Sequence, residues 1–307
     1  MKLGFIYAGQ GTQYVGMGQS FYENDEDCKN LLDSVELDFD LKDIMFNSDE
    51  KTISMTRFTQ PAMVAVANMA TLLLKKNGIT PDYVCGLSLG EYSALSASGV
   101  FDPKTAIQVV RERGLAMEKA AEGVESAMMA ILGLEREPLL DICVGCDGYV
   151  SIANYNCPGQ LVIAGEKKAV EEAGQKALDN GARRAVPLNT SGPFHTKLLK
   201  DASVRLHEVF KDVTFHEMNV PVIFNCTGKE LEDCSVQEML EKQVMSPVYF
   251  EDSIRTMINN GVDTIIEIGP GKVLSGFVRK IDRKIKTYQV EDMASLQKCV
   301  EAINETK

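Results

Sequence analysis

Residues 84–91 read Val84-Cys85-Gly86-Leu87-Ser88-Leu89-Gly90-Glu91, a Gly-x-Ser-x-Gly pattern. Residues 81–85 before it predict a short buried strand, and the small residues 91–98 after it predict a helix that stops at Gly99. A strand, a sharp turn and a helix around this pattern are typical of a nucleophile elbow, which exposes the serine hydroxyl at the carboxyl end of a sheet. The alternative is a glycine-bounded turn with no chemistry.

The composition limits the classes of protein to consider. Of 307 residues, 45% are hydrophobic and 25% charged, which is typical of a globular chain with a sizeable core. The net charge of −12 argues against general binding to nucleic acid or to anionic membranes. Residues 1–7 predict a strand and not a secretory signal, and no apolar stretch is long enough to span a bilayer. We therefore expect a cytoplasmic protein without membrane contact.

The cysteines give no sign of a metal or redox site. Eight are scattered along the chain, and the nearest pair, Cys143 and Cys146, has no second pair at zinc-binding spacing. We expect this pair to be apolar filling in a reducing compartment, and we expect no metal.

The order of predicted elements indicates two units. Residues 126–188 predict strand, helix, strand, strand, helix and strand, which is a ferredoxin-like βαββαβ arrangement. The segments on either side predict strands alternating with helices, which favours a mainly parallel sheet. We therefore predict an α/β fold: a large α/β-hydrolase-like domain, residues 1–124 and 191–307, with an inserted small ferredoxin-like subdomain, residues 125–190.

Three further helices are predicted from the pattern of the large unit. Residues 21–37 look like one amphipathic helix. A second helix is expected to open at Phe58 with Pro61 in its first turn, and its apolar residues 62–70 predict burial under the sheet. A last helix with basic residues is expected after residues 269–271.

Two arginines on one predicted helix differ in the direction they are expected to face. Within residues 104–121, Arg113 shares a face with the apolar residues Val110 and Met117, whereas Arg111 is expected to turn outward. A buried arginine is costly without an anionic partner. The sequence leaves two interpretations of Arg113 open: an anion-binding site, or a structural salt bridge to a glutamate.

A candidate base accompanies the candidate nucleophile. Of the three histidines, His207 and His216 lie in polar surroundings, whereas His195 lies at a junction between a loop and a helix, where site residues concentrate. A serine nucleophile needs a base near neutrality, and imidazole is the usual one. A glycine turn at residues 9–13 follows the first strand and can bring backbone N–H groups close to a ligand, although it lacks the pattern of a P-loop.

Eight stretches along the chain form one ordered set of motifs. They are residues 9–13 (GQGTQ), 59–62 (TQPA), 86–91 (GLSLGE), 111–114 (RERG), 154–160 (NYNCPGQ), 192–195 (GPFH), 243–248 (QVMSPV) and 267–271 (EIGPG). In this order they resemble the malonyl-CoA:acyl carrier protein transacylases of fatty acid synthesis and the acyltransferase domains of polyketide synthases. The resemblance spans nearly the whole chain.

The resemblance implies a role for several residues. Ser88 would be the nucleophile that takes the acyl group, and His195 the general base. Gln10 and Leu89 would supply backbone N–H groups to an oxyanion hole. Arg113 would hold the free carboxylate of malonate, and Gln243 would lie near the histidine, which the family orients by a backbone carbonyl.

Two further positions bear on selectivity. In the resemblance, a phenylalanine at the position of Phe194 is associated with unbranched malonyl over methylmalonyl groups. The family usually has histidine directly before the nucleophile, whereas this chain has Leu87, so no hydrogen-bonding role can be carried over to that position.

The resulting hypothesis is ping-pong transfer of a malonyl group from malonyl-CoA to the phosphopantetheine thiol of acyl carrier protein, without a cofactor of the enzyme's own. The alternative is a serine acyl-thioesterase or hydrolase with the same elbow; a non-catalytic scaffold would not need Ser88, His195 and Arg113 together. We expect a monomer. Two exposed basic runs are candidates for docking the carrier protein: Arg279, Lys280, Arg283, Lys284 and Lys286, or Arg183 and Arg184.

Overall fold

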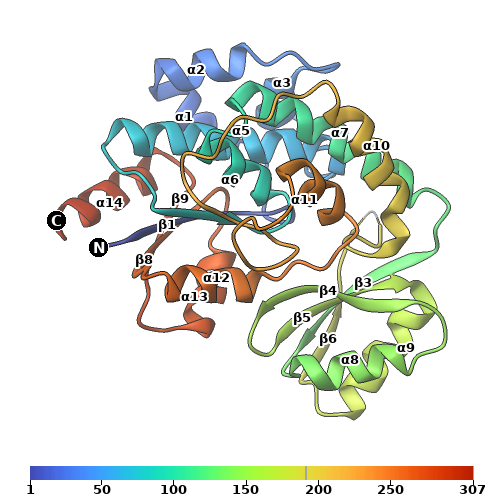
Figure 1. The fold of residues 1–307 in the computed structure, drawn as a ribbon. Coiled ribbons are helices and arrows are strands. Elements are labelled where there is room, and N and C mark those ends of the chain that lie inside the picture. The colour runs from blue at the N-terminus through green and yellow to red at the C-terminus, as the bar shows by residue number, and fades with distance from the viewer. Residues whose placement is uncertain (191, 307) are drawn as a thin grey trace.

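The computed structural model describes residues 1–190 and 192–306, which form two β-sheets of different kinds (Figure 1). The five-stranded sheet has the order β7-β2-β1-β8-β9, and its strands pair in parallel. Its strands are β1 (Leu3–Tyr7), β2 (Tyr83–Gly86), β7 (Val222–Ile223), β8 (Thr264–Ile268) and β9 (Lys286–Val290). The predicted α/β class with a mainly parallel sheet is therefore confirmed.

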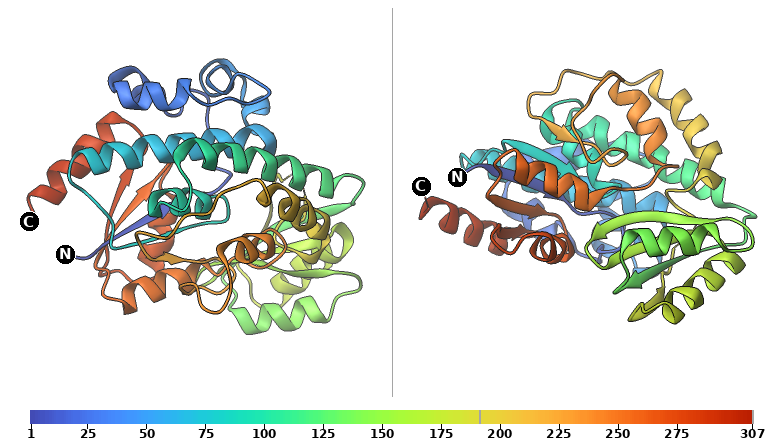
Figure 2. Two further views of the ribbon diagram at one scale, coloured as in Figure 1. Left: turned by 45° about the horizontal axis from the view of Figure 1, so that its top comes forward. Right: turned by 60° about the horizontal axis from the view of Figure 1, so that its bottom comes forward.

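Helices cover both faces of this sheet, as Figures 1 and 2 show. On one face lie α5 (Thr56–Lys76), α6 (Gly90–Ser98) and α7 (Pro103–Ala121), and on the other α12 (Phe250–Asn259) and α13 (Val273–Ile281). Helix α5 is buried along most of its length, as its apolar sequence predicts. The remaining helices of this unit are α1 (Gln19–Asn24), α2 (Glu26–Asp33), α3 (Leu41–Asn47), α4 (Glu50–Ile53), α10 (Lys200–Phe210), α11 (Val236–Gln243) and α14 (Met293–Asn304).

The four-stranded sheet is antiparallel and has its own core. Its order is β4-β5-β3-β6, with strands β3 (Ser126–Leu132), β4 (Val150–Cys157), β5 (Gln160–Glu166) and β6 (Arg184–Pro187). Helices α8 (Arg136–Val144) and α9 (Lys167–Asp179) pack on it, at the lower right of Figure 1. The predicted βαββαβ order is confirmed. The division into domains at residues 124 and 190 stays a prediction, and its residues Ser191 and Lys307 lie outside the described part of the chain.

The nucleophile elbow follows from the register of β1 and β2. Tyr7 pairs with Gly86, so the two parallel strands end side by side and their following loops meet at one edge of the sheet. Ser88 has φ of 53°, a left-handed conformation that non-glycine residues rarely adopt. A Cβ added at Gly86 would lie 2.0 Å from the backbone carbon of Gly90, so the turn has no room for a side chain.

Replacing Gly90 with alanine is expected to lower the free energy of unfolding by about 3 kcal/mol or more. Its Cβ would lie 2.1 Å from the carbonyl oxygen of Tyr7, and strand backbone cannot move aside cheaply. Urea unfolding of the variant would measure the loss. Gly276→Ala is the matched control, because a Cβ there meets nothing within 4 Å and alanine favours the helix. Equal stability of the two variants would contradict the expectation.

Three sequence predictions of helices were wrong in detail. The predicted helix at residues 21–37 is two helices, because the Asp25 side chain accepts hydrogen bonds from the Asp27 and Cys28 N–H groups and starts α2 afresh. The helix predicted to open at Phe58 begins two residues earlier, so Pro61 lies inside it. The basic helix α13 is not the last element, because β9 and α14 follow it.

The early start of α5 has a tertiary cause. The carboxylate of Glu118, on α7, accepts hydrogen bonds from the Arg57 backbone N–H at 3.0 Å and from its Nε at 2.6 Å. The first-turn N–H is therefore capped by a side chain of another helix. Met55, at the N-cap position, makes no side-chain hydrogen bond, so the local sequence gives no signal for this helix start. Among the described residues, no helix combines the length and the apolar character needed to cross a bilayer.

Candidate active site

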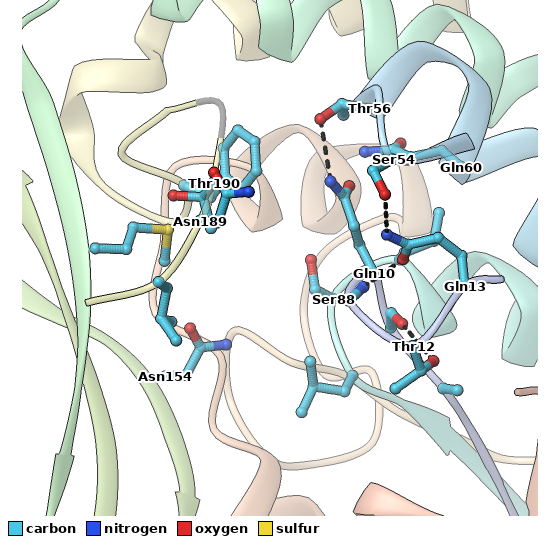
Figure 3. Close-up of a pocket in the computed structure, with 18 of the residues that line it drawn as sticks. Gln10, Thr12, Gln13, Ser54, Thr56, Gln60, Ser88, Asn154, Asn189 and Thr190 are labelled. Carbon is cyan, nitrogen blue, oxygen red and sulfur yellow. Dashed lines mark hydrogen bonds between the residues drawn. The ribbon is translucent and has the colours of Figure 1, made fainter. Parts of the chain in front are cut away.

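A cavity of about 920 Å³ opens where β1 and β2 end, between the two sheets. Figure 3 shows Ser88 at its centre, with Gln10 and Thr56 on one wall and Asn154 and Thr190 on the opposite wall. The first wall comes from the five-stranded unit, and the second from β4 and the segment after β6. Both units therefore contribute to the same cavity.

Ser88 and His195 are in direct contact, although they lie 107 positions apart in the sequence. Ser88 Oγ lies 2.6 Å from His195 Nε2. On the other side of the ring, Nδ1 lies 2.9 Å from the Gln243 carbonyl oxygen and 3.2 Å from that of Ser246. Because carbonyl oxygens only accept hydrogen bonds, we assign the proton of the neutral ring to Nδ1. Nε2 is then free to accept the serine proton, and within the described part of the chain backbone carbonyls, not a carboxylate, orient the imidazole.

The pKa of His195 is lowered from 6.5 to about 4, mainly because the ring is buried and also because Arg113 is near. The neutral ring, which is the form able to take a proton, therefore persists well below pH 6.5. We expect the acylation rate to stay level from pH 8 to pH 5 and to fall only near pH 4. Rapid-quench measurement of the acyl-enzyme across this range tests this expectation. A fall in the rate centred at pH 6–7 would contradict it.

Arg113 lies beside the serine and is fully buried, with no exposed side-chain area. Its Nη2 donates to Ser88 Oγ at 3.1 Å and to Gln243 Oε1 at 3.0 Å, and its guanidinium lies 5.2 Å from the centre of the Tyr92 ring. Within the described part of the chain, Arg113 Nε and Nη1 have no hydrogen-bond partner and no carboxylate pairs with the group. The predicted inward position is confirmed. Among the described residues the guanidinium has no ion pair, although the charge of the buried Glu91 acts on it.

The prediction for the neighbouring Arg111 was wrong. It is not turned to solvent but buried with 6% of its area exposed, under the loop that contains Asp38 and Phe39. Its Nε and Nη2 donate to the two oxygens of Asp38 at 2.9 and 2.6 Å. A loop far away in the sequence covers this face of α7, which helical spacing alone does not reveal.

Gln243 joins the other groups of the site. Besides its backbone contact with the histidine, its side chain accepts from Arg113 and its Nε2 donates to the Ser88 carbonyl oxygen at 2.8 Å. One residue at the end of α11 therefore touches the candidate nucleophile, the candidate base and the arginine.

The backbone N–H groups of Gln10 and Leu89 donate to no other atom of the described residues. Leu89 directly precedes α6, whose N-terminus has partial positive charge. Gly9 lets the first loop approach the elbow, because a Cβ there would lie 2.5 Å from the Leu87 carbonyl oxygen. The Leu87 side chain packs at this same approach, and Phe194 lines the cavity with 8% of its area exposed.

Sequence reasoning missed several polar residues of the site. Asn225 and Glu91 are buried behind Ser88, and Gln60 lines the cavity with its Oε1 unpartnered among the described residues. The position of Asn225 carries a signal, because it lies two residues after the end of β7. The ends of parallel strands meet at one sheet edge, and β7 pairs with β2. Within residues 1–190 and 192–306, no group of three or more His, Cys, Asp and Glu side chains gathers as a metal site.

The arrangement defines a class of enzyme. A serine on an elbow, in hydrogen-bond contact with a neutral histidine and beside free backbone donors, is typical of enzymes that form an acyl-serine ester.

Comparison with known proteins narrows the class. The family model of the acyl transferase domain matches residues 4–302. The malonyl CoA-acyl carrier protein transacylase of Bacillus subtilis is 42% identical over 99% of this chain and 98% of its own length. The crystal structure of that transacylase from Clostridium perfringens superposes with a TM-score of 0.95 at 41% identity, covering 100% of this chain and 98% of the other. A malonyl-transacylase in complex with its type II PKS acyl-carrier protein has a TM-score of 0.94 at 33% identity, covering 98% of this chain and all of the other.

The chain belongs to the acyl transferase domain family and is an enzyme of the transferase class.

Proposed function

We propose that this enzyme transfers a malonyl group from malonyl-CoA to the phosphopantetheine thiol of acyl carrier protein. The observation on which the proposal depends most is Arg113: a buried guanidinium that has no ion pair among the described residues, 3.1 Å from the hydroxyl of Ser88. Burying such a charge is costly, and an acyl group that ends in a carboxylate would repay the cost. The names of the relatives, malonyl CoA-acyl carrier protein transacylases, point to the same acyl group.

In the first half-reaction, Ser88 Oγ attacks the thioester carbonyl while His195 Nε2 takes its proton. The developing oxyanion accepts hydrogen bonds from the Gln10 and Leu89 N–H groups. The carbonyl oxygens of Gln243 and Ser246 hold Nδ1–H and stabilise the imidazolium. The thioester C–S bond then breaks, and His195 returns the proton to the leaving thiolate, so that free CoA and malonyl-Ser88 remain.

In the second half-reaction the carrier-protein thiol gives its proton to His195 and attacks the malonyl-serine ester. The same backbone donors stabilise the oxyanion, and the proton returns to Ser88 Oγ as the ester bond breaks. Both half-reactions need only the substrates and these side chains, so the mechanism requires no resident cofactor. Arg113 holds the acyl carboxylate throughout.

The competing function is hydrolysis, in which water replaces the carrier thiol. Product analysis separates the two: the enzyme is incubated with malonyl-CoA, with and without holo carrier protein. With carrier protein present, we expect malonyl carrier protein as the main product. Without it, we expect malonate to be released at least tenfold more slowly than the malonyl group is transferred when the carrier is present. Malonate release at one rate in both reactions would show a hydrolase instead.

Selectivity against branched acyl groups is assigned to Phe194, whose ring lines the cavity beside the site. Phe194→Ser is expected to reduce the preference for malonyl-CoA over methylmalonyl-CoA by about tenfold, since one methyl group in a pocket is worth roughly 1–3 kcal/mol. Competition between the two thioesters, with both products quantified by mass, measures the ratio. An unchanged ratio in a folded variant would remove Phe194 from the selectivity determinants.

We propose the basic run of residues 279–286 as the docking surface for the carrier protein. Val273, Leu274 and Phe277, on α13, line the cavity, and the exposed Arg279 and Lys280 close the same helix. A partner seated there would have a short path to Ser88. Arg279→Glu with Lys280→Glu should raise KM for carrier protein but not for malonyl-CoA, whereas Arg183→Glu with Arg184→Glu tests the second run. An effect of the second pair alone would move the docking surface there.

We further assign the opposite wall of the cavity to a small subdomain, residues 125–190, inserted into the catalytic domain. The enzyme acts as a monomer in this proposal, because one chain supplies Ser88, His195 and Arg113. Sedimentation at the concentration used for activity tests the oligomeric state, and a stable dimer would contradict it.

A further inference from the structure

The backbone of Ser88 is in a strained conformation that something must hold. Its φ of 53° places a non-glycine residue in the left-handed region, which residues with a Cβ rarely adopt. Such a residue keeps its conformation only where its surroundings determine it. The direction of the serine hydroxyl toward His195 and of the next N–H toward the cavity both depend on this conformation.

The side chain of Asn225 forms hydrogen bonds with the two peptide groups on either side of Leu87. Asn225 Oδ1 accepts from the Ser88 N–H at 2.7 Å, and Asn225 Nδ2 donates to the Gly86 carbonyl oxygen at 2.7 Å. Asn225 is fully buried and is not among the residues that line the cavity. It therefore touches the elbow from behind and not the substrate.

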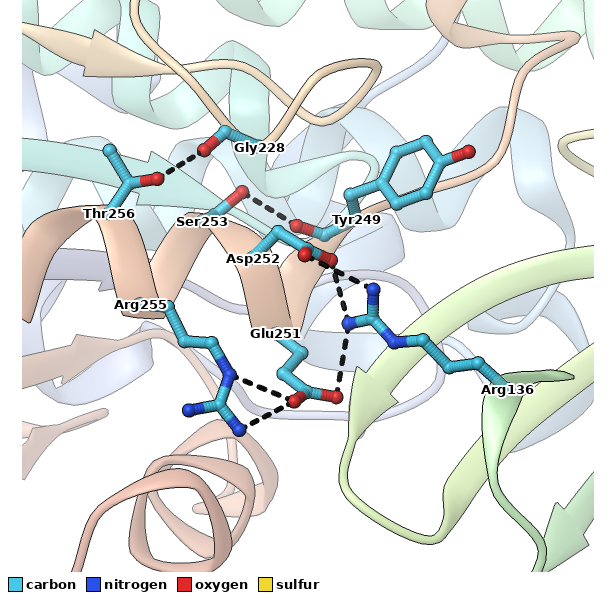
Figure 4. A network of polar contacts seen from close by, with 8 residues as sticks. All are labelled: Arg136, Gly228, Tyr249, Glu251, Asp252, Ser253, Arg255 and Thr256. Carbon is cyan, nitrogen blue, oxygen red and sulfur yellow. Dashed lines mark hydrogen bonds and ion pairs between the residues drawn. The ribbon is translucent and has the colours of Figure 1, made fainter.

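Asn225 is itself fixed by its own backbone. Its N–H donates to the carboxylate of Glu91, in the first turn of α6, and its carbonyl accepts from the Tyr249 N–H at 2.9 Å. The turn that contains it is also tied to α12, because Thr256 Oγ1 donates to the Gly228 carbonyl oxygen at 2.6 Å (Figure 4).

The N-terminal end of α12 is tied to the four-stranded unit. Arg136, on α8, pairs with Glu251 and Asp252 at 3.1 and 2.7 Å, as Figure 4 shows. The backbone around Asn225 is therefore held by contacts with α6 and α12, and α12 is in turn held by α8.

We propose that Asn225 is the positioning residue of the elbow: its side-chain amide holds Ser88 in the left-handed conformation and thereby sets the contact with His195. It also occupies the Ser88 N–H, so that the neighbouring Leu89 N–H is the donor that the elbow presents to the acyl oxygen. Without the amide, the peptide between Leu87 and Ser88 turns over to relieve the strain. The hydroxyl then leaves Nε2, and the Leu89 N–H turns away from the Gln10 N–H. This inference rests on the proposed role of Ser88 as nucleophile.

Asn225→Ala and Asn225→Asp test the inference in single-turnover acylation by malonyl-CoA. Aspartate still accepts from the Ser88 N–H but cannot donate to Gly86, so it also serves if the alanine variant does not fold. We expect the acylation rate constant to fall about 100-fold in Asn225→Ala and by a smaller factor in Asn225→Asp, with the Kd for malonyl-CoA within threefold of wild type. Asn68→Ala is the matched control: Asn68 is also buried and donates to a backbone carbonyl, that of Pro103, and neither residue lines the cavity.

A loss of stability alone would give a different result. If Asn225→Ala lowers the thermal midpoint as Asn68→Ala does but acylates at the wild-type rate per folded molecule, the positioning role is wrong. A second arm uses phenylmethylsulfonyl fluoride, which modifies an activated serine whatever the natural substrate, with intact mass as readout. Wild type that reacts with this reagent but not with malonyl-CoA would refute the proposed function only. Equal sulfonylation of wild type and Asn225→Ala would refute the positioning role.

Discussion

Replacing His195 with alanine is expected to slow acylation of the enzyme by about 10³- to 10⁴-fold. The reason is geometric: Nε2 lies 2.6 Å from Ser88 Oγ, and a serine hydroxyl with no base at this distance is a weak nucleophile at neutral pH. Rapid-quench measurement of the acyl-enzyme gives the rate constant directly. Binding of malonyl-CoA should change little, because the histidine acts on the proton and not on the acyl carboxylate.

The chain offers a matched control for this variant. His207 is about half exposed and lies 3.0 Å from the Glu241 carboxylate, away from the cavity. His207→Ala should acylate at the wild-type rate. If His195→Ala keeps its rate to within tenfold, His195 is not the base.

Replacing Arg113 with alanine is expected to lower kcat/KM for malonyl-CoA by about 10²- to 10³-fold, or roughly 3–4 kcal/mol. The guanidinium is buried beside the nucleophile, where a charge-assisted bond to the acyl carboxylate is little screened by water. The loss should be much smaller for acetyl-CoA, which has no carboxylate. The preference between the two substrates, measured in competition, should therefore move toward the neutral acyl group.

Two variants separate this effect from damage to the site. Arg111→Ala removes a buried arginine of the same helix whose partner is Asp38, so it should cost stability without changing the preference. Arg113→Lys keeps the charge but loses the planar fork and should fall between wild type and alanine. Unchanged preference for malonyl-CoA in a folded Arg113→Ala variant would overturn the assignment of the carboxylate site.

Local patterns were enough to predict the elbow and the order of elements along the small unit. The glycines of the elbow are visible in the sequence because the turn excludes a Cβ at Gly86 and Gly90. Alternating strand and helix signals predicted β3 to β6, since each strand there is bounded by turn residues. The helical spacing also placed Arg113 on the inner face of α7.

The features that the sequence did not reveal depend on contacts between segments far apart in the chain. The start of α5 depends on Glu118 of another helix, and the burial of Arg111 depends on the loop at Asp38. The hydrogen bond between Asn225 and the Ser88 N–H joins residues 137 positions apart. The resemblance supplied the candidate roles of Gln10, Leu89 and Gln243, because a backbone N–H or carbonyl group has no sequence signature of its own.

The central claim is that Ser88 carries the malonyl group as an ester during its transfer from malonyl-CoA to carrier protein. Intact mass after brief exposure to malonyl-CoA tests it most directly, with acetyl-CoA and a Ser88→Ala variant in parallel. We expect wild type to gain one malonyl group, with the adduct mapped to Ser88, and holo carrier protein to discharge it. Neither the Ser88→Ala variant with malonyl-CoA nor the wild type with acetyl-CoA should be acylated to a comparable extent. No adduct on wild type, or the same adduct on Ser88→Ala, would contradict the account.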